Sequence, residues 1–419
     1  MSILENLLKS KVKSFFSKDS SDYFKNVVKA IKDVGMYPEV NVITGPSCQP
    51  RITINGKEYL TFASNNYLGL AKNDELIQVT KSNLQKYGIG SGSTRLLSGT
   101  LDTHTELEKK LADFFGYESS ITFSSGFLAN VGVIRMLVDP FPYTKLLSHG
   151  QEGVIISDEL NHASVVDGIR LSKAERKIYK HNDMDELSYI LERNRRKRKL
   201  IVTDSVFSMD GDIANLHAIT KLAKEHDALV FLDDSHGVGV LGPHGKGAAH
   251  HLGIKDGIHV LMGSFTKSFG SIGGYVACSK EIEEYFRVTA RSYIFSDPII
   301  PSIAASLIKT VEIIYDGDDR RQTVINRAAY LRAELKALGF RVLGDIVPIV
   351  PIMIGNEKKV IQFSNELLKI GILAPAVRRP AVIEGKERLR LSLMATHKRE
   401  DIDLLIEECE KIGRKIGII

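Results

Sequence analysis

The chain has 419 residues, of which 43% are hydrophobic and 26% charged, a composition typical of a globular protein. This length suits two domains, or one large domain with a smaller lobe. A net charge of +5 gives no reason to expect a nucleic-acid partner. The basic run at 193–199 could suggest a nucleic-acid patch, but it closes a predicted helix, where cations are favourable, so we expect solvated surface there.

The three cysteines are widely spaced and form no CxxC pair, which fits a reducing compartment. No apolar run reaches the roughly 18 residues of a spanning helix. We therefore expect a cytoplasmic protein. Residues 3–18 form a basic amphipathic pattern, which could place a helix at the inner face of a membrane as a peripheral contact. The alternative is a helix docked on the body of the protein or on a partner subunit.

From about residue 60 to 300, apolar strands alternate with helical stretches. Such alternation predicts an α/β fold with a mostly parallel central sheet and helices on both faces. Functional side chains of such sheets gather at the carboxyl ends of the strands. The predicted strands are 120–123, 153–157, 200–203, 228–233, 259–263 and 274–278, and the clearest helices are 103–115 and 216–226.

After about residue 300 the pattern changes to long helices and short strands, which predicts a smaller C-terminal α+β lobe. We expect three parts: an N-terminal helical arm with a small-lobe segment (1–59), a large domain (60–300) and a small domain (301–419). The predicted helices of the lobe are 302–315, 322–338, 358–370 and 399–416, and its strands are 341–343, 349–354 and 388–393.

Two glycine patterns point weakly to nucleotide. Residues 237–242 match G-x-G-x-x-G, but PHGKG follows, so we expect a loop and not the helix that a dinucleotide site needs. Residues 88–95 lack the lysine of a phosphate-binding P-loop. A better phosphate cradle is 123–130 (FSSGFLAN), where small residues lead from a strand into a helix whose N-terminus favours an anion.

Asp233 and Lys267 carry the strongest chemical signal. Asp233 ends an apolar strand, where a buried carboxylate needs a cationic partner. Lys267 lies among small residues in GSFTKSFG. An acid and a lysine in these settings suit pyridoxal phosphate (PLP): the lysine holds the cofactor covalently, and the acid keeps the pyridine nitrogen protonated. His162, at another strand end, could stack on a flat ring, although a lone histidine is more often structural. For Asp234 we expect a structural role in the loop.

Several segments in order resemble the α-oxoamine synthases, which are fold-type-I PLP transferases. The resemblance covers roughly residues 35–415. It rests on NNYLGL (65–70), GSGSTR (90–95), SSGF (124–127), DELNHAS (158–164), VFSMDG (206–211), DDSHGVGVLG (233–242), GSFTKSFG (263–270) and RLRLS (388–392).

The resemblance implies a role for each candidate residue. It implies a homodimer with shared active sites, an amino acid and an acyl-CoA as substrates, and no metal. Lys267 would hold PLP and move the Cα proton, Asp233 would pair with the pyridine nitrogen, and His162 would stack on the ring. His236 and Ser208 would contact the phenolic oxygen, Ser125, Gly126, Phe127 and Ser264 the phosphate, and Asn65 and Arg390 the substrate.

Two places depart from the family pattern. Where the family often has a hydroxyl from the neighbouring subunit at the phosphate, this chain has Asp297, whose charge would repel phosphate. We expect either Ser296 to replace that hydroxyl or the loop to be displaced. The stretch 138–153 looks longer than the usual connection.

Three family reactions remain open. Serine palmitoyltransferase joins serine to a long acyl-CoA, 8-amino-7-oxononanoate synthase joins alanine to a pimeloyl thioester, and glycine C-acetyltransferase joins glycine to acetyl-CoA. The segments at 36–38 and 392–397 and the amphipathic N-terminus favour the first, 374–380 the second, and 158–174 and 412–417 the third. We lean to serine palmitoyltransferase. Outside the family, an aminotransferase and a catalytically silent partner subunit are the alternatives.

Overall fold

The structure is a computed structural model that describes residues 20–33, 37, 40–139 and 153–419. The chain forms two compact units, residues 1–44 with 53–57, and residues 45–52 with 58–419. In the first, α2 (Ser20–Asp33) precedes β1 (Ile43–Thr44), which pairs with Thr53 and Ile54 of β2 (Arg51–Ile54).

Two predicted features lie outside the described residues. These are the amphipathic pattern at 3–18 and most of the long stretch at 138–153, so the membrane contact stays a prediction. Among the residues that are described, every helix is too short or too polar to cross a membrane.

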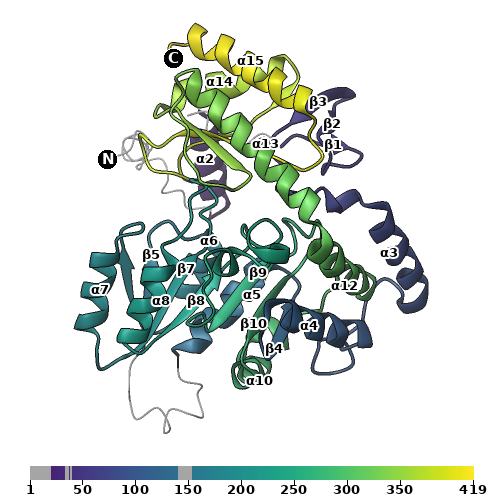
Figure 1. Ribbon diagram of the computed structural model, residues 1–419, viewed down its shortest axis with the longest axis vertical. Coiled ribbons are helices and arrows are strands. Elements are labelled where there is room, and N and C mark those ends of the chain that lie inside the picture. Colours follow the sequence, from purple (N-terminus) through teal and green to yellow (C-terminus); the bar gives the residue numbers. More distant parts are fainter. Residues whose placement is uncertain (1–19, 34–36, 38–39, 140–152) are drawn as a thin grey trace. The chain divides into compact units, whose positions relative to one another are not determined.

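The second unit is built on a seven-stranded sheet of order β4-β10-β9-β8-β7-β5-β6 (Figure 1). The neighbours from β9 to β6 are parallel, and β10 runs antiparallel to both β4 and β9. The predicted, mostly parallel sheet is thus confirmed. The strands are β4 (Ser119–Phe123), β5 (Gly153–Asp158), β6 (Glu175–Tyr179), β7 (Arg198–Asp204), β8 (Ala228–Asp233), β9 (Val260–Ser264) and β10 (Gly274–Cys278).

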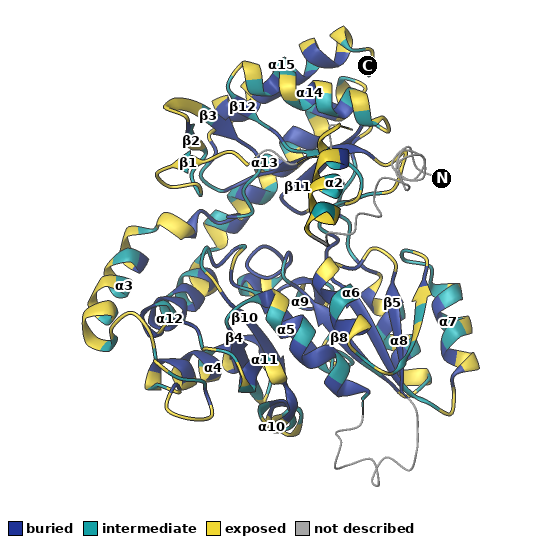
Figure 2. Ribbon diagram, turned by 180° about the vertical axis from the view of Figure 1, so that it is seen from behind, coloured by how far each residue is buried: buried dark blue, intermediate teal, exposed yellow. Residues whose placement is uncertain are grey.

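Strand residues alternate between two apolar clusters because successive side chains point to opposite faces of a sheet. Val230 and Leu232 of β8 join one cluster, and Phe231 between them joins the other. The central strands β5, β8 and β10 are therefore mostly apolar and almost wholly buried (Figure 2). The strand β6 was not predicted, because this edge strand has alternating exposed residues and no apolar run.

Helices cover both faces, as predicted. The first cluster includes residues of α4 (Asp102–Phe115), α7 (Met184–Arg193) and α8 (Leu216–Glu225). The second includes residues of α5 (Gly126–Val133), α6 (Ala163–Arg170), α10 (Lys280–Thr289) and α11 (Arg291–Ile294). Short 3₁₀ turns lie at Leu70–Lys72, Ile134–Leu137 and Pro243–Gly245, and α9 spans Ala248–His251.

The C-terminal region contains long helices and a three-stranded antiparallel sheet of order β11-β14-β13. The strand β12 pairs instead with β3 through Leu60 and Thr61. Two further elements come from the earlier part of the chain, β3 (Lys57–Thr61) and α3 (Asp74–Tyr87). The helices and strands of the C-terminal region are α12 (Pro301–Asp316), α13 (Asp318–Ala337), β11 (Ile349–Met353), α14 (Glu357–Lys369), β12 (Ile372–Leu373), β13 (Ala376–Val377), β14 (Arg388–Ser392) and α15 (Arg399–Lys415).

One predicted strand of this region is wrong. Residues 341–343 form only an isolated bridge from Val342 to Ile352. Gly344 follows with φ at 89°, a left-handed conformation that turns the chain away before a ladder can extend. The apolar residues there are buried by the single bridge and by the neighbouring helices, so the strand-like composition is satisfied without a strand.

Candidate active site

The carboxyl ends of four neighbouring strands, β5, β7, β8 and β9, place polar side chains at one edge of the central sheet. Beside this edge lies a cavity of about 230 Å³. Its lining contains eight of the eleven predicted site residues. The lining residues are Ser125, Gly126, Phe127, Asn130, His162, Ser164, Asp204, Val206, Asp233, Ser235, His236, Met262, Ser264, Thr266 and Lys267.

Asp233 ends β8 and is only 6% exposed. One carboxylate oxygen, Oδ2, accepts a hydrogen bond from the Asn130 side chain at 2.8 Å. The other, Oδ1, accepts from the hydroxyl of Ser235 at 2.6 Å and from its backbone N–H at 3.1 Å. These donors hold the Asp233 side chain in one orientation beside the cavity that it lines.

The predicted phosphate cradle is the N-terminus of α5. Ser125 is its N-cap, and its hydroxyl oxygen accepts from the backbone N–H of Leu128 at 3.1 Å. Gly126 leaves no room for a side chain, because a Cβ there would lie 3.0 Å from Cβ of Ser264 and 3.1 Å from Cε of Met262. The cradle therefore brings the helix N-terminus and Ser264 of β9 together, an arrangement that binds anions.

Lys267 lies in the loop between β9 and β10. Its amine has one hydrogen-bond partner among the described residues, the hydroxyl of Thr266 at 3.3 Å. Burial lowers the pKa of this amine, the Asp233 carboxylate opposes the shift, and the Arg390 guanidinium adds to it. A partly desolvated amine with a lowered pKa is a better nucleophile and base at neutral pH.

His162 stands at the N-cap of α6, at the cavity. Its Nδ1 lies 2.7 Å from the Ser164 hydroxyl, which in turn accepts from the Asn130 side chain at 2.9 Å. Its backbone N–H donates to Oδ2 of Asp204 at 3.1 Å. Burial raises the pKa of Asp204 well above its ordinary value, and the charge of Asp233 adds to this effect.

His236 connects the cavity to the predicted substrate residues. Its Nδ1 lies 2.7 Å from the hydroxyl of Tyr67, which also lies 3.3 Å from Oδ1 of Asn65. Arg390 of β14 donates to the same Asn65 oxygen at 3.1 Å and to the hydroxyl of Ser392 at 2.9 Å. Neither Asn65 nor Arg390 lines the cavity, but this chain of hydrogen bonds connects both to it.

Ser208 is the one residue predicted to contact the cofactor that does not line the cavity. The loop after β7 contributes Val206 to the cavity, and Ser208 is absent from its lining. The backbone carbonyl of Ser208 accepts from Nε of Arg390 instead. Ser208 therefore contacts the residue predicted to bind substrate, and its contact with the phenolic oxygen stays a prediction.

The G-x-G-x-x-G segment forms a loop, as predicted, and packs around Asp234. A Cβ at Gly237 would lie 2.1 Å from Asp234 Oδ1, and one at Gly247 would lie 2.0 Å from Oδ2. The buried Asp234 carboxyl also accepts from the backbone N–H of Ala248 at 2.8 Å. This acid has the structural role predicted for it. Asp297 is exposed, while Ser296 lies 3.4 Å from the Ser124 hydroxyl beside the cradle.

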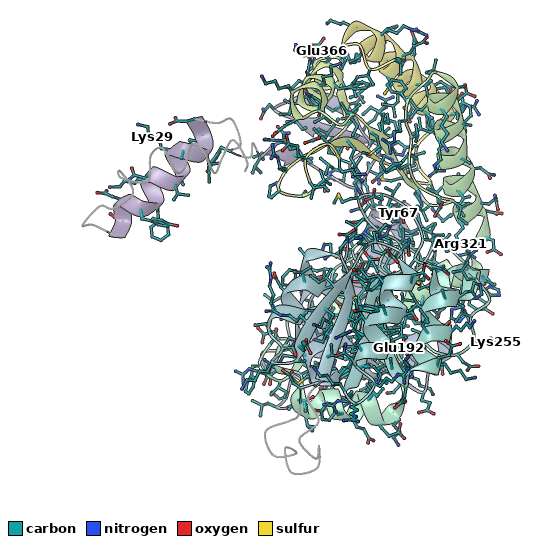
Figure 3. The ribbon with its side chains drawn as sticks, turned by 90° about the vertical axis from the view of Figure 1, so that its left-hand side faces the viewer. Lys29, Tyr67, Glu192, Lys255, Arg321 and Glu366 are labelled. Carbon is teal, nitrogen blue, oxygen red and sulfur yellow. The ribbon has the colours of Figure 1, made fainter. Side chains whose placement is uncertain are left out.

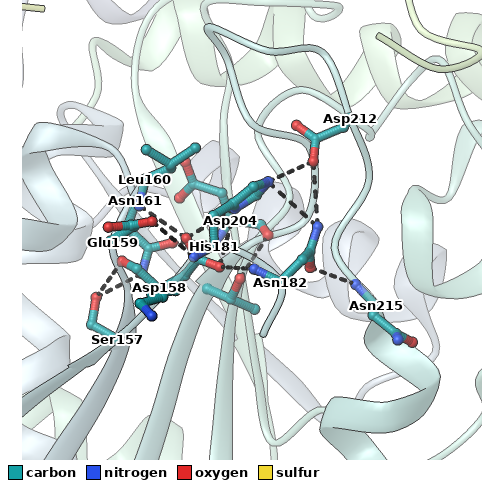
Figure 4. A network of polar contacts seen from close by, with 12 residues as sticks. Ser157, Asp158, Glu159, Leu160, Asn161, His181, Asn182, Asp204, Asp212 and Asn215 are labelled. Carbon is teal, nitrogen blue, oxygen red and sulfur yellow. Dashed lines mark hydrogen bonds and ion pairs between the residues drawn. The ribbon is translucent and has the colours of Figure 1, made fainter. Parts of the chain in front are cut away.

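A second polar network surrounds His181 (Figure 4). His181, which follows β6, lies 3.1 Å from the buried Asp158 carboxylate through Nδ1 and 2.7 Å from Asp212 through Nε2. Burial opposes a charged ring, but both carboxylates outweigh it and raise the pKa of His181 to about 10. The imidazolium thus connects the loops after β5, β6 and β7, two of which carry His162 and Val206.

The sequence reasoning missed several residues that line the cavity or contact a lining residue. Asn130 had a usable signal, because it is the one amide in the apolar helix GFLANVGV. Tyr67 had none, since an aromatic residue in NNYLGL is expected in any core. Ser164, in the first turn of α6, and Ser235, in the loop after β8, are small polar residues, and only their positions in space show that they orient His162 and Asp233.

The cavity residues fit PLP. An anion site at a helix N-terminus, an oriented carboxylate and an amine with a lowered pKa line the same space. One buried oxygen, Oδ1 of Asp204, has no hydrogen-bond partner in the part of the chain that the structure describes. A cofactor with a phosphate, a ring nitrogen and an aldehyde matches these groups one by one.

Comparison with known proteins places this site in context. The family model described as aminotransferase class I and II matches residues 57–408. The 8-amino-7-oxononanoate synthase of Thermosipho melanesiensis is 40% identical over 397 residues, which are 94% of this chain and 98% of the relative. That of Petrotoga mobilis is 40% identical over 405 residues, 96% of this chain and 100% of the relative.

Solved structures of PLP-dependent enzymes have the same fold as this chain. The serine palmitoyltransferase of S. paucimobilis, bound to PLP and myriocin, has a TM-score of 0.88 at 30% identity and covers 96% of this chain and 100% of its own. The 8-amino-7-oxononanoate synthase of Francisella tularensis has a TM-score of 0.73 at 26% identity, with 86% and 99% covered.

Proposed function

This chain belongs to the class I and II aminotransferase family and, within it, to the PLP-dependent α-oxoamine synthases, and we propose that it is an 8-amino-7-oxononanoate synthase. It is an acyltransferase that condenses a small amino acid with an acyl-CoA thioester. The observation that carries the finer assignment is the 40% identity, over nearly the whole length, to relatives of that name.

The preference for serine palmitoyltransferase that the sequence motifs suggested has weaker support. Solved palmitoyltransferases share this fold at 28–30% identity, below the 40% of the oxononanoate synthases. The membrane argument for a long acyl chain rested on residues 3–18, which are outside the described residues. The oxononanoate-like segment at 374–380, in contrast, contains β13, which pairs with β14, the strand of Arg390.

The residues of the cavity have complementary roles in this proposal. Bound PLP supplies an electron sink for the amino acid's Cα carbanion. Lys267 would hold the cofactor through its amine, and the same amine would remove the Cα proton. Asp233, fixed by Asn130 and Ser235, keeps the ring nitrogen protonated. His162 stacks on the ring from the start of α6.

The phosphate and the substrate are held at separate places. Ser125, Gly126 and Phe127 present the N-terminus of α5 to the phosphate, together with the hydroxyl of Ser264. Arg390 binds the amino-acid carboxylate with its planar guanidinium, and Asn65 holds that guanidinium in place. His236 donates to the phenolic oxygen of the cofactor. Ser208 acts through its contact with Arg390.

Substrate identity is tested by a matrix of glycine, alanine and serine against acetyl-, pimeloyl- and palmitoyl-CoA, scored by release of free thiol. We expect alanine with pimeloyl-CoA to give the highest kcat/KM. Serine with palmitoyl-CoA as the best pair would overturn the substrate assignment. Thiol release from no pair, with transfer of the amino group to a keto acid, would indicate an aminotransferase instead.

The lysine role is tested with Lys267→Ala, which should lose the visible absorption band of the bound cofactor and all thiol release. Lys255→Ala is the matched control, because Lys255 is exposed at the surface (Figure 3). A Lys267→Ala protein that still turns over would contradict the assignment.

The proposed enzyme is a homodimer whose active sites are shared. Exposed apolar side chains support this, since a monomer rarely leaves many of them in water. Ile89, Leu97 and Phe295 are 84%, 81% and 68% exposed. Phe295 adjoins Ser296, which contacts the segment leading into the phosphate cradle.

Sedimentation of the purified protein should give twice the 46.5 kDa of the chain. Leu97→Asp should shift it towards monomer and reduce thiol release. Ile178→Asp, a change at another exposed apolar residue on the edge strand β6, should not. A fully active monomer would contradict the shared site.

A further inference from the structure

Tyr67 is a buried aromatic residue whose hydroxyl adjoins the cavity histidine. It follows β3, in the segment that also carries Asn65, and none of its surface is exposed. Figure 3 shows it in the interior of the second unit, surrounded by side chains. Its hydroxyl oxygen lies 2.7 Å from Nδ1 of His236, a distance typical of a short, well-formed hydrogen bond.

His236 has one ring proton to place. Burial holds the pKa of its imidazole well below the ordinary value, and the positive charges of Lys267 and Arg390 add to this effect. The ring is therefore neutral at neutral pH, with its proton on either Nδ1 or Nε2. Each tautomer offers the cavity a different group: Nε2 is a donor in one and an acceptor in the other.

Tyr67 has one proton to donate and two neighbours that could accept it. Burial raises the pKa of Tyr67 to about 12, so its oxygen keeps that proton at neutral pH. Asn65 Oδ1 is the poorer candidate, since it lies at 3.3 Å and already accepts from Arg390 at 3.1 Å. His236 Nδ1 lies at 2.7 Å and has no other donor among the described residues.

From these contacts we propose that Tyr67 is a positioning residue that donates its hydroxyl proton to Nδ1 of His236 and so fixes the Nε2–H tautomer. The imidazole then presents an N–H donor on the side away from Tyr67, in a ring that lines the cavity of Lys267 and Asp233. The tautomer follows from this chain alone. Only the acceptor of that N–H, an anionic oxygen of the cofactor ring, rests on the proposed function.

The second cavity histidine has the same arrangement. Nδ1 of His162 lies 2.7 Å from the Ser164 hydroxyl and 3.3 Å from the Ser164 backbone N–H. The hydroxyl of Ser164 already accepts from Asn130, so its own proton is available for His162. A hydroxyl donor thus stands behind each ring, and Ser164 provides a matched control for Tyr67.

The test is histidine-selective ¹⁵N NMR of the protein without cofactor, with the His236 signals assigned by their loss in His236→Asn. We expect wild-type His236 to be protonated at Nε2 and unprotonated at Nδ1. Tyr67→Phe keeps the buried ring and removes the donor, so it should populate the Nδ1–H tautomer of His236 and leave His162 unchanged. Ser164→Ala, which leaves Tyr67 in place, should leave the His236 tautomer unchanged.

A wild-type His236 protonated at Nδ1 would overturn the proposal without any variant. So would an unchanged His236 tautomer in a folded Tyr67→Phe protein. In the cofactor-loaded enzyme, Tyr67→Phe should also move the pH midpoint of the cofactor's absorption band by about half a unit or more, and the exposed control Tyr189→Phe should not. Failure of the thiol-release matrix with the expected tautomer would reject the proposed function and leave this inference standing.

Discussion

Asn130 donates a hydrogen bond to Asp233 across 2.8 Å, and this bond joins the helix of the phosphate cradle to the acid at the end of β8. The same amide donates to Ser164 Oγ at 2.9 Å. Asn130 thus orients both the carboxylate expected at the ring nitrogen and, through Ser164, the histidine expected over the ring face. One side chain thereby coordinates two functions that the sequence assigned to separate segments.

Replacing Asn130 should weaken cofactor binding. Asn130→Ala removes one donor from Asp233 and one from Ser164, so we expect the Kd for PLP to rise about tenfold, equivalent to ~1.4 kcal/mol. Asn130→Asp should be worse, because it places a second negative charge beside Asp233. Titration of the apoenzyme with PLP measures both. The control is Asn215→Ala, which removes the exposed cap of α8 and should leave the Kd unchanged.

Asp204 and Asp233 should respond differently to loss of charge. Burial and the charge of Asp233 raise the pKa of Asp204 and so disfavour its anion, and Asp204→Asn, which cannot ionise, should keep kcat/KM within about threefold. Asp233→Asn removes the partner of the ring nitrogen and should lower kcat/KM by about 100-fold or more. Steady-state kinetics decide this, and equal losses in the two variants would show that Asp204 works as an anion.

Arg390 should determine the affinity for the amino acid. Arg390→Lys keeps the positive charge but loses the planar fork, so we expect KM for the amino acid to rise about 10- to 100-fold. KM for acyl-CoA and the Kd for PLP should change little. Arg399→Lys, an exposed change on α15, is the control. A similar rise in KM for the amino acid, KM for acyl-CoA and the Kd for PLP would instead indicate a structural role for Arg390.

His181 should make stability depend on pH. Its pKa is raised from 6.5 to about 10 in the folded chain, so its stabilising contribution is complete below about pH 6.5 and is lost as pH rises through about 10. With allowance for its partial exposure, we expect a contribution of ~2 kcal/mol. His181→Asn should make the denaturant midpoint depend less on pH between those values, whereas the exposed His217→Asn should leave its pH dependence unchanged. An unchanged profile would show that His181 is neutral.

The sequence alone was sufficient for the alternation of strands and helices and for most of the candidate residues. Apolar strands such as 228–233 and 274–278 were located to the residue, because strands buried on both faces are apolar throughout. The polar edge strand β6 and the false strand at 341–343 show the limit of this reasoning. Pairing at a sheet edge depends on neighbours that composition does not encode.

Local order in the chain determined which residues could do chemistry: Lys267 among small residues, Asp233 at a strand end, and glycine and serine at the start of α5. Tertiary structure decided which of them meet. Of the loop after β7, Val206 and not the predicted Ser208 lines the cavity. Asn130 lies between Asp233 and Ser164 and donates a hydrogen bond to each. It also brought Tyr67 to His236 from 169 positions away. A hydrogen bond depends on distances of tenths of an ångström between segments remote in sequence, and only the packed sheet and helices fix those distances.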